Sequence, residues 1–335
     1  MQPRNVARAI GIIAVVAAVV VAAAFAGGLL LGPSTQSEAP NAPAYNTNEL
    51  IAEPIEDDGS VTAPTDGQAK TVVIDMSHGN DVSENDLQPL IDALVAADHN
   101  VRMYSGGTSS IGSQPGAAFN ETLRGADALV AASPATTYSS NEVAGVEAFA
   151  DAGGRVLLAA EPPTTTSTTS TVSIPGLSSG GTIAAAGQPT NLAATFGVSF
   201  GNGYLYDMTE NANNFQSVHA GGDSGVADGV ENAILTDATP VTTGGDASSV
   251  LTASDVSLSS TREEASYSVA ARNGDVLAVG DTDFLTSSAT AGDNDVLLSN
   301  VAAFLVSGDK EAGAPASPSS STGEQNGTMP PVMTA

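Results

Sequence analysis

Between residues 71 and 160, four short apolar runs alternate with three segments of helical apolar spacing. The first run, Val72–Ile74, belongs to the stretch Thr71–Asn80 and ends in polar residues and a glycine, as an inner strand does. The later runs are Val101–Tyr104, Ala128–Ala132 and Arg155–Ala160. Strands that alternate with helices form βαβ units, so the pattern predicts an α/β domain. We expect a mainly parallel sheet with helices on both faces.

The segments between these runs have recognisable helix signals. Ser83–Asp86 and Ser139–Glu142 both resemble capping boxes, which predict helices over roughly Asn85–Ala97 and after Ser139. Phe119–Arg124 is a third, shorter helix candidate. Further along, residues 163–190 are rich in Thr, Ser and Gly and predict a long surface loop.

The last part of the domain is predicted to hold more strands and two helices. A short helix is expected at Leu192–Phe196, and the final strand, Asp275–Val279, precedes a helix that runs through Leu305. Residues with strand preference lie at Ala233–Thr243, Val250–Leu258 and Tyr267–Ala271.

The N-terminal region contains an uncharged apolar stretch, residues 9–31, whose length suits a transmembrane helix of roughly 20 residues. Arg4 and Arg8 precede it, and no basic residue follows before Lys70, so residues 1–8 are expected in the cytoplasm and the rest outside. This predicts a single-pass protein of the cell membrane. The alternative is a signal peptide cleaved after Ala24-Phe25-Ala26, which would give a secreted protein.

The segments that flank the domain have the composition of disordered chain. Residues 32–69 are rich in Pro, Ala, Ser, Thr and acids, and residues 307–335 in Pro, Ser and Gly. Such segments bury too little apolar surface to offset the entropy of ordering them. We therefore predict a linker at 32–69, the α/β domain at 70–306 and a disordered tail at 307–335.

The formal net charge of −28 excludes one class of partner. With 9 Lys and Arg against 37 Asp and Glu, the chain has no basic patch for phosphates, so nucleic-acid binding is not expected. Scattered acids with few lysines are typical of proteins adapted to high salt. The chain contains no cysteine, and it has neither a Walker loop nor a dinucleotide glycine fingerprint, so no cofactor is predicted.

Polar side chains follow the ends of the predicted parallel strands. Since open α/β sheets bind ligands at the carboxyl edge of their strands, these residues form a candidate ligand-binding rim. The set is Asp75, His78, Asn80, Ser133, Glu161, Asp281 and Asp283. Such residues also stop strands and cap helices, so a purely structural role is the competing explanation.

The rim also allows a catalytic hypothesis. Ser133 as nucleophile, His78 as base and Asp75 or Asp281 as orienting carboxylate would make a hydrolase, and the carboxylates with His78 would suit a metal-dependent enzyme. Ser133 is followed by Pro134 and lacks the Gly-x-Ser-x-Gly elbow, which counts against the hydrolase. Elsewhere, Asn120 and Asn326 begin N-glycosylation sequons, and His99 is expected to be solvated.

Three stretches carry a resemblance to a known family: VVIDMSHGN, the segment ALVAASP through GGRVLLAAEP, and DVLAVGDTDFL. They resemble the archaeal and bacterial domain-of-unknown-function family 4350 and, more distantly, the extracytoplasmic auxiliary proteins of gliding-type ABC transporters. The resemblance implies a flavodoxin-like, class I glutamine amidotransferase-like fold and an accessory role near a transporter. Glutamine amidotransfer itself needs a cysteine nucleophile, so its absence excludes that reaction.

These observations favour a non-catalytic, membrane-anchored extracytoplasmic domain that binds a partner protein or a small ligand at its rim. The partner would be a membrane or cell-surface protein. A hydrolase or metal-dependent enzyme that uses His78, Asp75, Ser133 and Asp281 is the alternative, and a surface structural protein without a site is a third.

Overall fold

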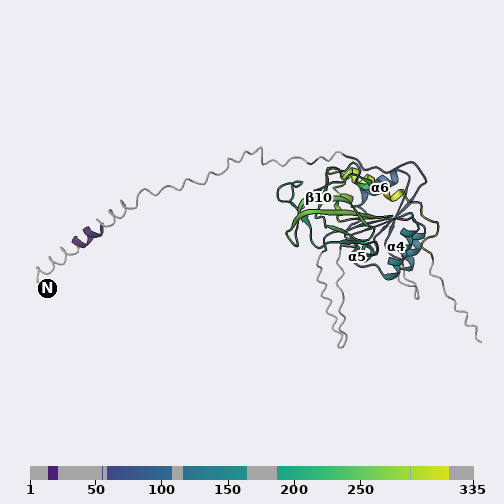
Figure 1. Ribbon diagram of the computed structural model, residues 1–335, viewed down its shortest axis with the longest axis horizontal. Helices are drawn as coiled ribbons and strands as arrows, with labels where there is room; N and C mark the ends of the chain where they lie inside the picture. Colours follow the sequence, from purple (N-terminus) through teal and green to yellow (C-terminus); the bar gives the residue numbers. More distant parts are fainter. Residues whose placement is uncertain are drawn as a thin grey trace, which may run out of the picture. The chain divides into compact units, whose positions relative to one another are not determined.

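A computed structural model describes residues 14–21, 55, 59–107, 116–163, 187–286 and 288–316 (Figure 1). The chain divides into two units, residues 1–53 and 54–335. In the first unit, residues 14–21 are helical. Among all the described residues, no helix combines the length and the apolar character that crossing a bilayer requires.

The second unit is built on an eight-stranded sheet of order β2-β1-β3-β4-β12-β11-β10-β6. The first five strands run parallel, and the last three pair antiparallel. The parallel strands are β2 (Asn100–Tyr104), β1 (Thr71–Asp75), β3 (Ala128–Ala132), β4 (Arg155–Ala159) and β12 (Val276–Val279). The antiparallel strands are β11 (Glu264–Asn273), β10 (Ser248–Leu258) and β6 (Leu205–Tyr206). The predicted α/β architecture with a mostly parallel sheet is confirmed.

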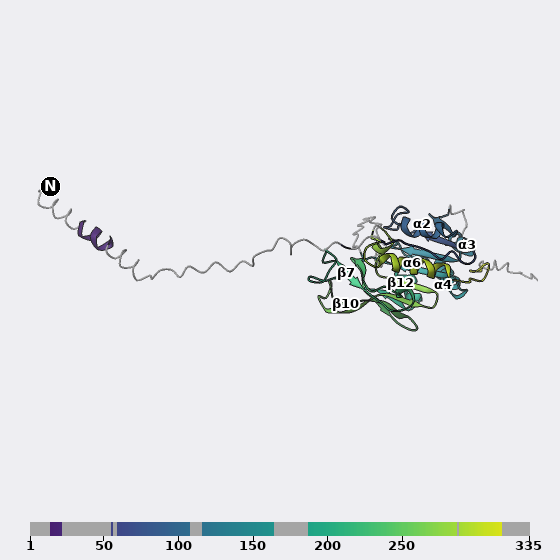
Figure 2. The ribbon, with the colours of Figure 1, turned by 90° about the horizontal axis from the view of Figure 1, so that it is seen from above.

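Helices cover both faces of this sheet. Successive side chains of a strand point to opposite faces, and in β1 Val72 and Ile74 belong to one apolar core while Val73 belongs to the other. The first core is completed by α2 (Gln88–Ala96) and α6 (Asn294–Val306). The second is completed by α3 (Ala117–Arg124), α4 (Ser140–Asp151) and α5 (Thr190–Thr195). In Figure 1, α6 lies on one side of the sheet and α4 and α5 on the other, and Figure 2 views the domain from the α6 side.

Smaller elements extend the antiparallel end. Two two-stranded sheets pair β5 with β9 and β7 with β8. Their bounds are β5 (Val198–Phe200), β7 (Ser217–Ala220), β8 (Ala233–Thr236) and β9 (Val241–Thr243). Single turns of 3-10 helix, η1 (Gly225–Ala227) and η2 (Asp283–Leu285), follow β7 and β12.

Of the two predicted capping boxes, one forms. Ser139 Oγ accepts from the backbone N–H of Glu142, whose carboxylate accepts from the Ser139 N–H, so α4 begins as predicted. In the other, the Ser83 N–H and hydroxyl both donate to Asp86 Oδ2, at 2.8 and 2.7 Å. That arrangement closes a turn instead of capping a helix, and α2 begins at Gln88, later than the predicted Asn85.

Part of the predicted linker packs on the domain. Val61 and Ala63 are partly buried against the core, and the Thr62 N–H donates to Ser299 Oγ of α6 at 2.9 Å. The expectation that His99 is solvated is wrong. His99 is buried, with Nδ1 accepting from the Lys70 N–H at 3.1 Å and Nε2 2.9 Å from the Pro64 carbonyl oxygen.

The domain also continues beyond residue 306. Lys70 Nζ donates to the Gly308 carbonyl at 2.6 Å, and the Glu311 N–H donates to the Ala152 carbonyl at 2.8 Å. Residues 59–69 and 307–316, which composition assigned to the linker and the tail, are thus held by the domain. Most of the predicted loop 163–190, the remaining tail with Asn326, and most of residues 9–31 lie outside the described residues.

Candidate functional site

The sheet order brings the predicted rim residues to one edge. Strands β1, β3, β4 and β12 are consecutive neighbours and parallel, so their carboxyl ends lie in a row. Asp75 ends β1, Ser133 follows β3, Glu161 follows β4 and Asp281 follows β12. Side-chain contacts divide this row into two groups, one around Asp75 and His78 and one around Glu161 and Asp281.

The first group is a buried network centred on His78. Its Nδ1 lies 2.6 Å from Asp75 Oδ2, and its Nε2 lies 3.6 Å from Glu142 Oε2. The Tyr138 hydroxyl donates to Asp75 Oδ2 at 2.6 Å, and its ring stacks on the imidazole with centroids 3.8 Å apart. Ser77 donates from its backbone N–H and its hydroxyl to Asp75 Oδ1, at 3.0 and 2.7 Å.

This arrangement makes His78 a cation. Burial alone would lower the pKa of His78, but the hydrogen bonds to Asp75 and Glu142 outweigh it and raise that pKa to about 9. Burial alone would likewise raise the pKa of Asp75, but hydrogen bonds from His78, Tyr138 and Ser77 hold it below its ordinary value. At neutral pH an imidazolium therefore lies between two carboxylates, with no lone pair free to act as a base.

Three members of this network, Ser77, Tyr138 and Glu142, were not among the predicted rim residues. Burial raises the pKa of Tyr138 well above its ordinary value, so its hydroxyl keeps its proton and serves as a donor. Glu142 has a double role, because the oxygen that accepts from the Ser139 N–H at 2.7 Å also faces His78. The sequence marks Glu142 only as part of a capping box, and a capping box predicts the start of a helix and not a contact with His78.

The second group is acidic. Glu161 Oε1 accepts from the Thr282 N–H at 2.7 Å and from the Thr282 hydroxyl. Burial raises the pKa of Glu161 to about 7, with Asp283 and Asp237 adding to the rise. Asp281 is fully buried, and burial together with Glu161 and Asp283 raises its pKa well above the ordinary value. Burial therefore favours the protonated form of the Asp281 carboxyl.

Buried polar atoms without a partner lie at the same edge. Ser133 is fully buried with a φ of +44°, a left-handed conformation that is costly for serine, and its Oγ has no hydrogen-bond partner. Asp281 Oδ1 accepts from the Phe284 N–H at 3.0 Å, whereas Oδ2 has no partner. Asn80 Nδ2 donates to the Ala132 carbonyl at 2.6 Å, and its Oδ1 is also unpartnered.

The geometry bears on the catalytic alternatives. Because Ser133 Oγ has no hydrogen-bond partner, the Ser133–His78 bond that a hydrolase needs is not formed. Within the described ranges, no group of three or more His, Asp or Glu side chains is arranged to hold a metal ion.

The two N-glycosylation sequons begin at Asn120 and Asn326. Asn120 is buried, and its Nδ2, the atom that a glycan would modify, donates to the Asn141 carbonyl at 2.9 Å. The folded domain therefore does not present Asn120 for glycosylation. Asn326 lies outside the described residues.

Comparisons with known proteins found a likeness of structure and none of sequence family. No protein-family model matches the chain, and no curated protein matches it. Among solved structures, the chain is similar to the mmIFT52 N-terminal domain, with a TM-score of 0.52 and 13% identity over 72% of this chain and 99% of that one. At that identity the likeness concerns the fold alone.

A second structure, alpha-L-fucosidase isoenzyme 2 from Paenibacillus thiaminolyticus, aligns with a TM-score of 0.37 and 12% identity. The alignment covers 69% of this chain and 32% of that one.

Proposed function

We propose that this protein is a membrane-anchored extracytoplasmic accessory protein whose α/β domain binds a partner protein or a small ligand at the carboxyl edge of its sheet. The proposal includes a flavodoxin-like, class I glutamine amidotransferase-like fold and a place beside a transporter, as the resemblance to family 4350 implies. The uncharged stretch of residues 9–31 supports the anchor.

The observation that carries the proposal is the pair of unpartnered buried atoms, Ser133 Oγ and Asp281 Oδ2. Leaving a buried polar atom without a hydrogen bond costs about 1–3 kcal/mol, so a group that supplies the missing bond would be stabilising. Both atoms follow strands of the same parallel set, at the edge where α/β sheets bind ligands. A bound group that offers hydrogen bonds there would recover that cost.

Binding is favoured over catalysis by the state of His78. A general base must offer a free lone pair near the operating pH, but both imidazole nitrogens of His78 face carboxylates. His78 instead supplies a fixed positive charge held between the Asp75 and Glu142 carboxylates. Such a fixed charge can orient a polar ligand.

The test is affinity capture with the full chain as bait from membranes solubilised at high salt. Wild type is compared with Asp281→Asn, which keeps the side chain's shape, and with Glu147→Gln, a matched change at an exposed residue of α4. We expect a partner recovered with wild type and with Glu147→Gln and lost with Asp281→Asn. Equal recovery with all three baits would contradict a binding rim.

The anchor has its own test. Cell fractionation followed by N-terminal sequencing of the mature protein should find it in the membrane with its N-terminal segment intact. A mature chain that begins at Gly27 would show cleavage and secretion.

A further inference from the structure

A cluster of partly exposed aromatic rings lies at the antiparallel end of the sheet, where β6 is the last strand. Leu205 of β6 is fully buried, so its neighbours Tyr204 and Tyr206 point to the opposite, outer face. Phe215, which is 41% exposed, completes the group. The three ring centroids are 6.3–6.5 Å apart and the rings meet edge to face. We call Tyr204, Tyr206 and Phe215 the aromatic triad.

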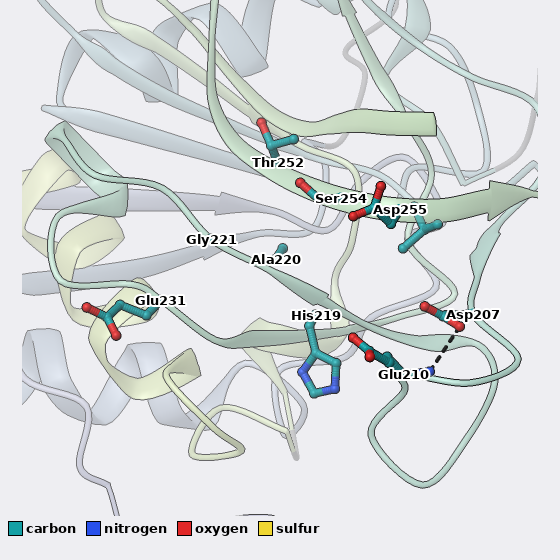
Figure 3. Close-up of a pocket in the computed structure, with 10 residues that line it drawn as sticks. Asp207, Glu210, His219, Ala220, Gly221, Glu231, Thr252, Ser254 and Asp255 are labelled. Atoms are coloured by element: carbon teal, nitrogen blue, oxygen red, sulfur yellow. Dashed lines mark hydrogen bonds between the residues drawn. The ribbon is translucent and has the colours of Figure 1, made fainter. Parts of the chain in front are cut away.

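Figure 3 shows an acidic pocket of about 420 Å³ whose lining includes Asp207. Asp207 follows Tyr206 in the chain, and its N–H donates to the Phe215 carbonyl at 2.8 Å, which links the pocket to the triad. The carboxylates of the pocket come from separate elements, and a bulge in β10, where Asp255 has a φ of +55°, contributes one of them. The four carboxylates are Asp207, Glu210, Glu231 and Asp255. His219 also lines the pocket, and no Lys or Arg does.

Figure 3 shows the Glu210 and Asp207 side chains on the same side of the pocket as His219. Glu210 and Glu231 are exposed, so their charges face solvent. In the described ranges these carboxylates are not arranged as a metal site. The surface thus combines aromatic ring faces with uncompensated negative charge.

We propose that the aromatic triad and the adjoining acidic pocket form a docking surface for a Lys- and Arg-rich segment of a partner protein. Aromatic faces attract guanidinium and ammonium groups through the quadrupole of the ring, and carboxylates hold the next cation along. Charge complementarity thus selects the occupant. This surface is separate from the rim of the proposed function, and each stands without the other.

A second copy of this chain does not fit that surface. The chain carries 37 acidic residues against 9 basic ones, so a copy would bring negative charge to a negative pocket. Like charges placed across an interface disfavour association. The occupant is therefore a different, basic chain.

The test uses the full chain and a fluorescein-labelled hexa-arginine peptide, with binding followed by fluorescence anisotropy. Because the whole protein is acidic, the decisive variant removes rings without changing charge. We expect Tyr206→Ser with Phe215→Ser to weaken binding about tenfold, on the scale of two cation–π contacts. Val95→Ser removes a side chain that is 54% exposed on α2, and it should leave binding within about twofold.

A second pair of variants tests the charge. Glu210→Gln with Glu231→Gln should weaken binding about tenfold at about 0.15 M salt and less at about 1 M, where the Debye length is about 3 Å. The matched control is Glu84→Gln with Glu147→Gln, two exposed acids elsewhere. Circular dichroism checks that each variant is folded. If the double ring variant unfolds, the single change Phe215→Ser replaces it.

The first results that would overturn the proposal concern wild type, the ring variant and its control. They are the absence of saturable binding to wild type, undiminished binding to the ring variant, and an equal loss in the ring variant and Val95→Ser. A loss common to both pairs of charge variants would likewise show that the peptide reads only the overall charge.

Discussion

The buried His78 network should make stability fall as the pH rises above neutral. The pKa of His78 is about 9 in the folded domain against an ordinary value of 6.5. Between these two values the folded state keeps a proton that the unfolded chain has released. The stabilisation is therefore complete below about pH 6.5 and is lost as the pH rises through about 9. At 1.36 kcal/mol per pKa unit, we expect a loss of about 2–3 kcal/mol from about pH 7 to about pH 9.

The assay is urea unfolding followed by circular dichroism at fixed salt across that range. The slope is compared with that of His78→Gln, which should be nearly flat. Lys310, whose pKa burial lowers, is present in both proteins, so its effect cancels in the comparison. If His78→Gln does not fold, Glu142→Gln removes one of the two carboxylates and should give an intermediate slope.

The control for this prediction is His219→Gln, which alters a histidine outside the network and should keep the full slope. A wild-type slope no steeper than that of His78→Gln would refute the view that the carboxylates hold His78 as a cation.

Other predictions concern the rim and the turns that place it. Glu161→Gln should stabilise the domain at about pH 8 and have little effect at about pH 4. The pKa of Glu161 is raised from 4.5 to about 7, so its ionisation costs stability that is lost between these two values; urea titrations at both pH values test this. Gly280→Ala should lower the free energy of unfolding by about 3 kcal/mol, because an added Cβ would overlap the Thr239 carbonyl. Gly274 lies in open space with a φ of +55°, so Gly274→Ala should lower it by about 1–2 kcal/mol; thermal unfolding measures both. Ser139→Ala should lower the free energy of unfolding by about 1 kcal/mol, because it removes the cap of α4. Ser83→Ala should lower it much less, since Ser83 caps no helix, and thermal unfolding measures both.

The inner strands were predictable because their whole environment is apolar. Ala128–Ala132 is buried at every position and matches β3 at both ends. Arg155–Ala160 exceeds β4 by a single residue. A strand buried on both faces is a continuous apolar run, so its length can be read directly. The parallel order then places the strand-end residues on one edge.

The contacts within the site were not predictable, since they depend on packing between distant segments. Tyr138 and Asp75 are 63 residues apart, and only the seating of α4 on the sheet brings the Tyr138 hydroxyl to the carboxylate. Sequence spacing also could not separate Asp281 from Asp283. Asp281 is fully buried, whereas Asp283 is partly exposed, so the two carboxyls have different environments.

The predicted domain limits, residues 70 and 306, were too narrow because composition averages over a whole segment and misses single residues that pack on the domain. Residues 59–69 hold only a few apolar side chains, but Val61 and Ala63 lie against the core. Gly308 packs where an added Cβ would lie 2.8 Å from the Gly153 carbonyl oxygen. A glycine that marks a flexible tail by composition here permits a close backbone contact.

We propose that His78 is a fixed cation in a binding rim and not a catalytic base. The chain has only three histidines, so selective ¹⁵N-histidine labelling of the full protein gives three imidazoles to assign by NMR. We expect both nitrogens of His78 to be protonated at about pH 7.5 and the imidazolium to lose its proton near pH 9. A neutral His78 imidazole that titrates near 6.5 would contradict the fixed cation and would favour the hydrolase hypothesis.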